Sequence, residues 1–183
     1  MITAVILAAG ESSRMGFPKQ TLLYKNKTLL EWAVEAAQKS RCEEVIVVLG
    51  ALRLDTGVPT LYNENWQEGI ASSIRLAVEH AKAADSILFM LCDQPFVSRA
   101  LLDSMLFKQS QTNKPIIACG YNDTVGVPVL FEKSMFSDLL ALKGKEGAKK
   151  LLEKYPGDIA VIPFEKGAID IDTIADYEKL ISD

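Results

Sequence analysis

The chain has 183 residues, of which 49% are hydrophobic and 24% charged, and its formal net charge is −4. This length predicts one domain over residues 1–183, and the lack of a basic tail or patch argues against a nucleic acid partner. No run reaches the roughly 18 apolar residues of a membrane span, and no signal peptide pattern opens the chain, so no membrane partner is expected.

Short β-branched runs alternate with amphipathic helical patterns in the first part of the chain. Strands are expected at residues 2–7, 45–49, 60–62 and 86–91. Helices are expected at residues 28–40, 67–83 and 98–109. Thr28 and Glu31 form a capping box at the first helix, and Ser98 is the expected N-cap of the third.

The pattern is less regular after residue 110. Strands are expected at residues 115–119, 127–131, 159–163 and 168–171. Helices are expected at residues 134–142, 146–155 and 173–182, the last with Asp176 at the capping-box position. This alternation predicts an α/β fold of three layers, doubly wound around a mainly parallel sheet. Ligands of such sheets bind outside the carboxyl ends of the strands.

The loop after the first strand has the composition of a polyphosphate site. Ala8, Ala9 and Gly10 allow the backbone to approach a base or a phosphate closely, and successive N–H groups in such a turn attract anions. Arg14 and Lys19 then add two full positive charges. From the loop alone, an ordinary strand-to-helix connection remains equally open, because neither standard glycine-rich nucleotide motif is present.

Three acidic residues follow predicted strands. Asp93 comes directly after the run at residues 86–91, where it serves either as a Mg²⁺ ligand or as a cap before Pro95. Asp170 and Asp172 alternate along the predicted strand at 168–171 and would therefore share one face. They complete a cation site; alternatively, Asp172 or Thr173 only caps the last helix.

The cysteines and the histidine carry little chemistry. Cys42, Cys92 and Cys119 form no C-x-x-C pair, which favours neither zinc nor a disulfide framework and is typical of a cytoplasmic protein. His80 is the only histidine and lies within a predicted helix away from the motifs, so no Ser/His/Asp or Cys/His arrangement is available.

Five segments, in order, resemble molybdenum cofactor cytidylyltransferases of the MobA-like NTP transferase superfamily. The first is Leu7-Ala8-Ala9-Gly10-x-Ser12-x-Arg14-Met15-Gly16-x-x-Lys19. The others are Asn63-x-x-Trp66-x-x-Gly69-x-x-Ser72-Ser73, Leu91-Cys92-Asp93-Gln94-Pro95, Gly126-Val127-Pro128-Val129-Leu130-Phe131 and Asp170-Ile171-Asp172-Thr173. The resemblance implies the Rossmann-like fold of nucleotide-diphospho-sugar transferases, with a hairpin-like insertion in the second half.

The resemblance also implies roles for individual residues. The catalytic set is Arg14, Lys19 and Asp93. Nucleotide-binding residues are Leu7, Ala8, Ala9, Gly10, Ser12, Arg14, Lys19, Ser72 and Ser73. Acceptor-binding residues are Asn63, Trp66, Gly126, Pro128 and Lys149. Ligands of Mg²⁺ or Mn²⁺ are Asp93, Asp170 and Asp172.

The implied reaction transfers CMP from CTP to the phosphate of molybdopterin, giving molybdopterin cytosine dinucleotide and pyrophosphate, with a molybdoenzyme as the receiver. Ala9 is typical of the cytidylyl type, because guanylyl relatives carry glycine there. Two departures concern the acceptor side: Lys145 stands where the family has Asp, and Lys149 where it has Arg. Other phosphorylated acceptors, such as a sugar or polyol phosphate, stay open, as does a non-catalytic chaperone that delivers the cofactor.

Overall fold

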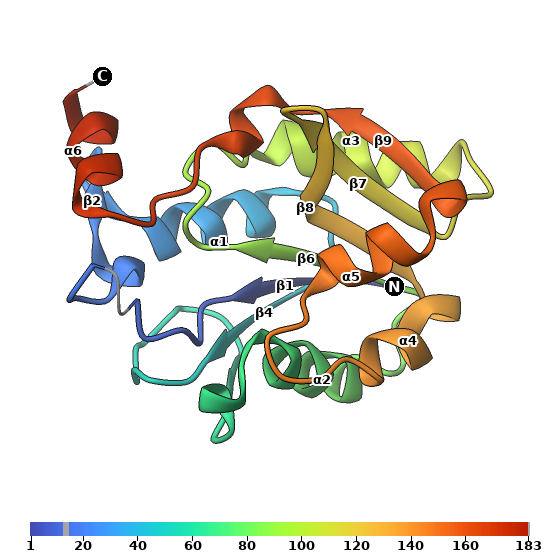
Figure 1. Cartoon of the computed structure of the whole chain (residues 1–183), viewed down its shortest axis with the longest axis horizontal. Helices are drawn as coiled ribbons and strands as arrows, with labels where there is room; N and C mark the ends of the chain where they lie inside the picture. Colours follow the sequence, from blue (N-terminus) through green and yellow to red (C-terminus); the bar gives the residue numbers. More distant parts are fainter. Residues whose placement is uncertain (13–14, 183) are drawn as a thin grey trace.

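In the computed structural model, which describes residues 1–12 and 15–182, seven strands form the central sheet in the order β5-β4-β1-β6-β8-β7-β9 (Figure 1). Their bounds are β1 Ile2–Leu7, β4 Glu44–Leu49, β5 Thr60–Tyr62, β6 Ser86–Leu91, β7 Ile116–Tyr121, β8 Thr124–Glu132 and β9 Ile159–Pro163. Strand β8 runs antiparallel to β6 and β7, whereas the other neighbouring pairs are parallel. The mostly parallel α/β sheet is confirmed.

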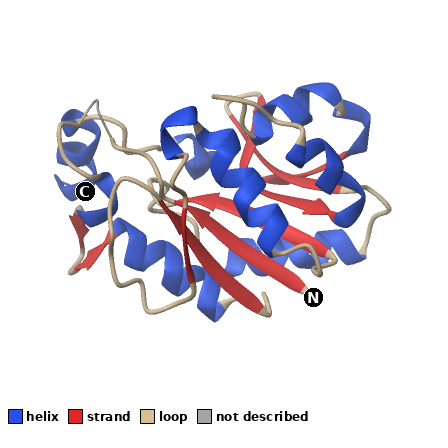
Figure 2. Cartoon of the chain, turned by 90° about the horizontal axis from the view of Figure 1, so that it is seen from below, coloured by secondary structure: helices blue, strands red, loops and turns tan. Residues whose placement is uncertain are grey.

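Helices cover both faces of this sheet, as Figures 1 and 2 show. Helices α1 (Leu29–Lys39) and α3 (Arg99–Ser110) pack on one face, and α2 (Ile70–His80), α4 (Phe136–Leu140) and α5 (Ala148–Lys154) on the other. The side chains of β1 alternate between the layers: Val5 points into the α2 layer and Ile6 into the α1 layer. These three layers confirm the predicted fold class.

A third, smaller cluster joins the two ends of the chain. A two-residue turn at Lys25 and Asn26, both with positive φ, links β2 (Leu23–Tyr24) to β3 (Lys27–Thr28). Helix α6 (Ile174–Ser182) packs beside this hairpin, where Tyr177 Oη donates to the Leu23 carbonyl at 2.8 Å. This hairpin was not predicted from the sequence.

Local capping signals correctly placed the starts of three helices. Thr28 and Glu31 form the predicted capping box, Ser98 accepts from the Leu101 amide, and Thr173 exchanges hydrogen bonds with Asp176. No helix in the described part of the chain is both long enough and apolar enough to cross a membrane.

Several predicted elements have other bounds in the structure, such as β8, which begins at Thr124 rather than at residue 127, and two differences bear on the site. The helix expected over 67–83 begins at Ile70, because Gly69 adopts a φ of 123° and separates α2 from a 3-10 helix at Trp66–Glu68. The strand expected at 168–171 is wrong: a 3-10 helix at Glu165–Ala168 leads the chain away from the sheet. The cause is tertiary, since Ile171 is fully buried in the third cluster and its amide donates to the Asp93 carbonyl at 3.0 Å.

Candidate active site

A pocket of about 400 Å³ lies at the carboxyl ends of β1 and β6, where the fold class predicts a ligand. The loop after β1 forms one wall, the start of α2 a second, and the end of β6 the third. Its lining includes Leu7, Ala8, Ala9, Gly10, Ser12, Lys19, Gln20, Trp66, Gly69, Ile70, Ser73, Leu91, Cys92 and Asp93.

The loop after β1 is held by hydrogen bonds to its own backbone. The Ala8 amide donates to the Val48 carbonyl at 2.9 Å, which continues the sheet by one residue. Gln20 Nε2 donates to the carbonyls of Ala8 and Gly10 at 2.7 and 2.9 Å. The Lys19 amide donates to Ser12 Oγ at 3.1 Å. The two ends of the loop are therefore tied together.

A charged cluster borders the pocket, whose lining includes Lys19 and Asp93. The Lys19 ammonium forms an ion pair with Asp93 and donates to Asp172 Oδ1 at 3.0 Å. Burial lowers the pKa of Lys19, but the charges and hydrogen bonds of the two carboxylates outweigh it and leave the pKa above its usual value. Lys19 is therefore a cation at neutral pH.

Asp93 is suited to bind a cation. Asp93 is 6% exposed, and its Oδ1 is buried without a hydrogen-bond partner among the described residues. A buried carboxylate oxygen left in this state is costly unless a ligand satisfies it.

Asp170 lies close enough to Asp93 for the two carboxylates to interact electrostatically. Partial desolvation of its carboxyl group raises the pKa of Asp170 to about 6, and the negative charge of Asp93 adds to the effect. The neighbouring Tyr121 also has a raised pKa, through burial and then the charge of Asp170.

This set of groups fits a hard divalent cation. Among residues 1–12 and 15–182, no three Asp, Glu, His or Cys side chains form a ready-made metal cage. Mg²⁺ does not need one, because it is commonly held by one or two carboxylates together with substrate phosphates and water. Asp93, with Asp170 and Asp172 near the same lysine, offers oxygen ligands of this kind. Cys92 is a poor ligand or nucleophile, because burial raises its pKa to about 12.

The start of α2 is organised by Asn63. Its Nδ2 donates to Ser72 Oγ and Ser73 Oγ at 2.8 and 2.9 Å, and its Oδ1 accepts from the Asn65 amide. The single proton of the Ser72 hydroxyl is shared between the carbonyls of Asn65 and Gly69, which lie 3.0 and 2.8 Å from Oγ. Of these side chains only Ser73 lines the pocket, so Asn63 and Ser72 shape its wall from behind.

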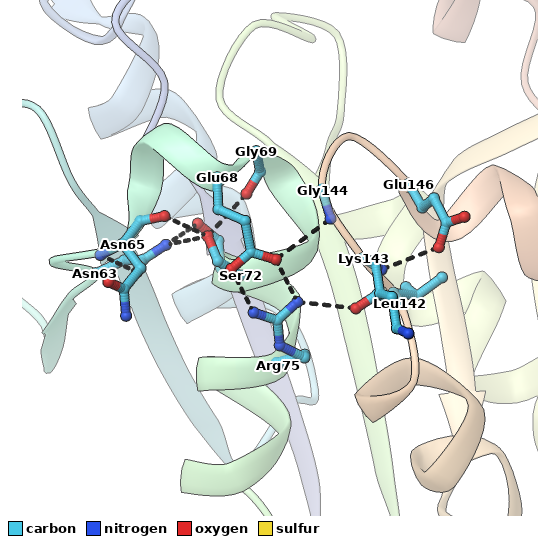
Figure 3. A network of polar contacts seen from close by, with 11 residues as sticks. Asn63, Asn65, Glu68, Gly69, Ser72, Arg75, Leu142, Lys143, Gly144 and Glu146 are labelled. Carbon is cyan, nitrogen blue, oxygen red and sulfur yellow. Dashed lines mark hydrogen bonds and ion pairs between the residues drawn. The ribbon is translucent and has the colours of Figure 1, made fainter.

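A polar clasp joins α2 to the loop between α4 and α5 (Figure 3). Arg75 binds both carboxylate oxygens of Glu68, at 2.9 and 2.7 Å, and donates to the Leu142 carbonyl at 2.8 Å. Glu68 also accepts from the Gly144 amide, and the Ala71 amide donates to the Gly144 carbonyl. The contact is so close that a Cβ on Gly69 would lie 2.3 Å from the Gly144 carbonyl oxygen.

A second, apolar pocket of about 280 Å³ adjoins the first and shares Leu7, Ile70 and Leu91 with it. Its other walls come from the β7–β8 hairpin and the start of α5. The lining includes Tyr121, Val125, Gly126, Val127, Gly147, Ala148, Lys149 and Leu152. Two ligands held in the two pockets would meet beside Leu7 and Leu91.

The residues expected to bind the acceptor do not all come together. Gly126 and Lys149 line the second pocket, whereas Trp66 lines the first. Asn63 is buried in the α2 network, and Pro128 is buried behind the second pocket. Arg14 lies outside the described residues.

Sequence reasoning assigned no role to Gln20, Glu68 or Arg75. Gln20 follows Lys19 directly, and a polar residue that is only 2% exposed is a sign of a structural hydrogen bond. Nothing local signals the clasp, because Gly144 lies 76 residues after Glu68.

Relatives of similar length carry different names. The chain is 27% identical over 196 residues to nicotine blue oxidoreductase of Paenarthrobacter nicotinovorans, covering 98% of this chain and 96% of that protein. It is 28% identical over 196 residues to the purine catabolism protein PucB of Bacillus subtilis strain 168, with coverages of 97% and 94%.

Solved structures match the whole chain. Rv0371c of Mycobacterium tuberculosis H37Rv superposes with a TM-score of 0.83 at 31% identity, covering 100% of this chain and 97% of that one. A second structure of Rv0371c is a complex with manganese. Residues 4–159 match the MobA-like NTP transferase domain. The chain therefore belongs to the MobA-like NTP transferase family and is a nucleotidyltransferase enzyme.

Proposed function

We propose that this enzyme transfers CMP from CTP to the phosphate of molybdopterin. An acceptor phosphate oxygen attacks the α-phosphorus of CTP, a new P–O bond forms, and the bond to the β-phosphate oxygen breaks. The products are molybdopterin cytosine dinucleotide and pyrophosphate, and a molybdoenzyme receives the dinucleotide.

The observation that carries this proposal is the Lys19–Asp93–Asp172 cluster, of which Lys19 and Asp93 line a pocket walled by Ala8, Ala9 and Gly10. A phosphate nucleophile is already ionised near neutral pH, so the reaction needs little help from a base. The difficulty lies in bringing two anions together, which calls for fixed positive charge.

In this proposal the first pocket binds the nucleotide and the second pocket binds the acceptor. Backbone amides of the loop after β1 and the Lys19 ammonium hold the triphosphate, and Arg14 neutralises the departing pyrophosphate. Mg²⁺ or Mn²⁺, held by Asp93 with Asp170 or Asp172, would supply further charge neutralisation when bound. The acceptor lies in the second pocket, with Gly126 and Lys149 beside it.

The preference for CTP rests on Ala9, which lines the first pocket and is 7% exposed. A methyl group on the pocket wall favours a smaller base, and one methyl is worth about 1–3 kcal/mol of discrimination. Ala9→Gly should therefore narrow the difference in kcat/KM between CTP and GTP.

The decisive experiment measures pyrophosphate release from each of the four nucleoside triphosphates, with Mg²⁺ and molybdopterin. We expect release that requires both CTP and molybdopterin, and its loss in Asp93→Asn, a variant of nearly the same shape. Release with a sugar or polyol phosphate instead would reassign the acceptor. Binding of molybdopterin without release in any mixture would favour a delivery chaperone.

A further inference from the structure

Gln20 is a buried polar side chain that joins the two ends of the loop after β1. It is 2% exposed and belongs to the short 3-10 helix Lys19–Thr21. Both of its hydrogen bonds go to carbonyls of the loop, at Ala8 and Gly10, 2.7 and 2.9 Å away.

These bonds fix the direction of two peptide units. In a trans peptide the C=O and the following N–H point in opposite directions. Because the Ala8 and Gly10 carbonyls point at Gln20, the N–H groups of Ala9 and Glu11 point away from it. These are two of the backbone donors that a loop of small residues can offer to an anion.

The same residue also connects the loop to the cationic group. Lys19 precedes Gln20, its amide is bound by Ser12 Oγ, and its ammonium lies between Asp93 and Asp172. The Gln20 side chain therefore ties the start of the loop to the residue that directly follows Lys19.

We propose that Gln20 is the positioning residue of the nucleotide pocket: it sets the orientation of the loop amides and their distance from Lys19. This inference rests on the proposed nucleotidyl transfer. Donors that are already oriented need no reorganisation when the triphosphate binds or when charge develops on it. Without the Gln20 amide, two inward-facing carbonyls lose their donors, and the peptide units can rotate.

The test compares Gln20→Met with Gln109→Met. Gln109 is a suitable control, because it lies on α3, outside both pockets, and its Nε2 donates to Ser86 Oγ at 2.5 Å. Calorimetry with Mg²⁺ and each of the four nucleoside triphosphates gives the affinity, and thermal unfolding reports the fold. We expect Gln20→Met to lower the affinity for the tightest-binding nucleotide about tenfold, which is the scale of one lost buried hydrogen bond. The affinity of Gln109→Met should stay within about twofold of that of the native chain.

A second variant separates hydrogen bonding from packing. Gln20→Glu keeps the shape of the side chain, but its carboxylate can only accept, so its nucleotide affinity at pH 8 should fall further than that of Gln20→Met. Protonation returns one O–H donor. The affinity of Gln20→Glu relative to the native chain should therefore recover as the pH is lowered from 8 to 6, whereas that of Gln20→Met should not.

The outcomes are distinct. Equal nucleotide affinity in the native chain and in a folded Gln20→Met variant overturns the role of Gln20 and leaves the proposed function standing. A native chain that binds none of the four nucleotides overturns both. Equal loss in Gln20→Met and Gln109→Met assigns the effect to general destabilisation and also overturns the positioning role.

Discussion

Lys19 combines two properties that are seldom found in one side chain. It is largely buried, and it is held as a cation by Asp93 and Asp172. Its stem begins just after Pro18, whose ring restricts the backbone there. The ammonium is thus positioned before any substrate binds, and it neutralises carboxylates that would otherwise repel a triphosphate.

Lys19→Ala should lower the turnover number by roughly 10²–10³-fold, the scale of losing one fixed donor to a developing charge. Nucleotide affinity should fall less, because the loop amides still hold the triphosphate. Lys19→Arg should rescue only in part, since a planar guanidinium cannot replace a compact ammonium between two carboxylates. Calorimetric affinity and the single-turnover rate at saturating nucleotide separate these effects. A variant that loses affinity and keeps its rate would make Lys19 a ground-state binding residue.

The raised pKa of Asp170 predicts how cation binding depends on pH. Because its pKa is raised to about 6, Asp170 takes up a proton as the pH falls through 6, and a protonated carboxyl group binds cations poorly. The affinity of the nucleotide-free chain for Mn²⁺, measured by electron paramagnetic resonance, should therefore fall from pH 7 to pH 5. Asp170→Asn should bind Mn²⁺ more weakly at pH 7 and show a flatter profile. Parallel profiles for the two proteins would exclude Asp170 from the cation site.

At the scale of elements, the sequence predicted what is locally determined. The capping box at Thr28 and the strand before Asp93 depend on neighbouring residues and on an apolar run, and both are present. The segment around Ile171 has a strand-like composition, but its path depends on burial under α6 and on the Asp93 carbonyl. Such long-range contacts leave no periodic signal.

The clasp between α2 and the α4–α5 loop is a second long-range feature, and it connects the walls of both pockets. Arg75→Met should raise the KM for the acceptor several-fold, because Gly147 and Lys149 lose their fixed position relative to Ile70. Nucleotide affinity should change by less than about twofold. The melting temperature should fall only slightly, because the pair with Glu68 is solvent-exposed and the main loss is the hydrogen bond from Arg75 to the Leu142 carbonyl.

Arg99→Met is the matched control for this prediction. It removes an exposed pair with Asp103 on α3, remote from the clasp. Exposed pairs contribute about 0–1 kcal/mol, so its melting temperature and acceptor KM should stay close to those of the native chain. Equal acceptor KM values for Arg75→Met and Arg99→Met would make the clasp a purely structural contact.

At the scale of the whole molecule, β6 joins two halves of different geometry. It pairs in parallel with β1 and antiparallel with β8, so the first pocket lies over the parallel half and the second pocket over the junction. The hairpin of β7 and β8, closed by positive φ at Asn122 and Asp123, forms the outer wall of the second pocket. In the proposed reaction, the two substrates would meet where the two pockets adjoin, beside Leu7 and Leu91.

A ligand that bridges β1, β6 and α2 should stabilise the whole domain, because these elements share one core. At a concentration about 100 times its dissociation constant, such a ligand contributes about 2.7 kcal/mol to the free energy of unfolding. For a chain of this length, CTP with Mg²⁺ should then raise the melting temperature by roughly 5–10 °C in a single cooperative transition. Asp93→Asn should show a smaller shift with CTP and Mg²⁺, and the same shift as the native chain with CTP in a chelating buffer. Two separate transitions, of which only one moves with CTP, would instead mean that the half carrying β7, β8 and β9 unfolds independently of the nucleotide pocket.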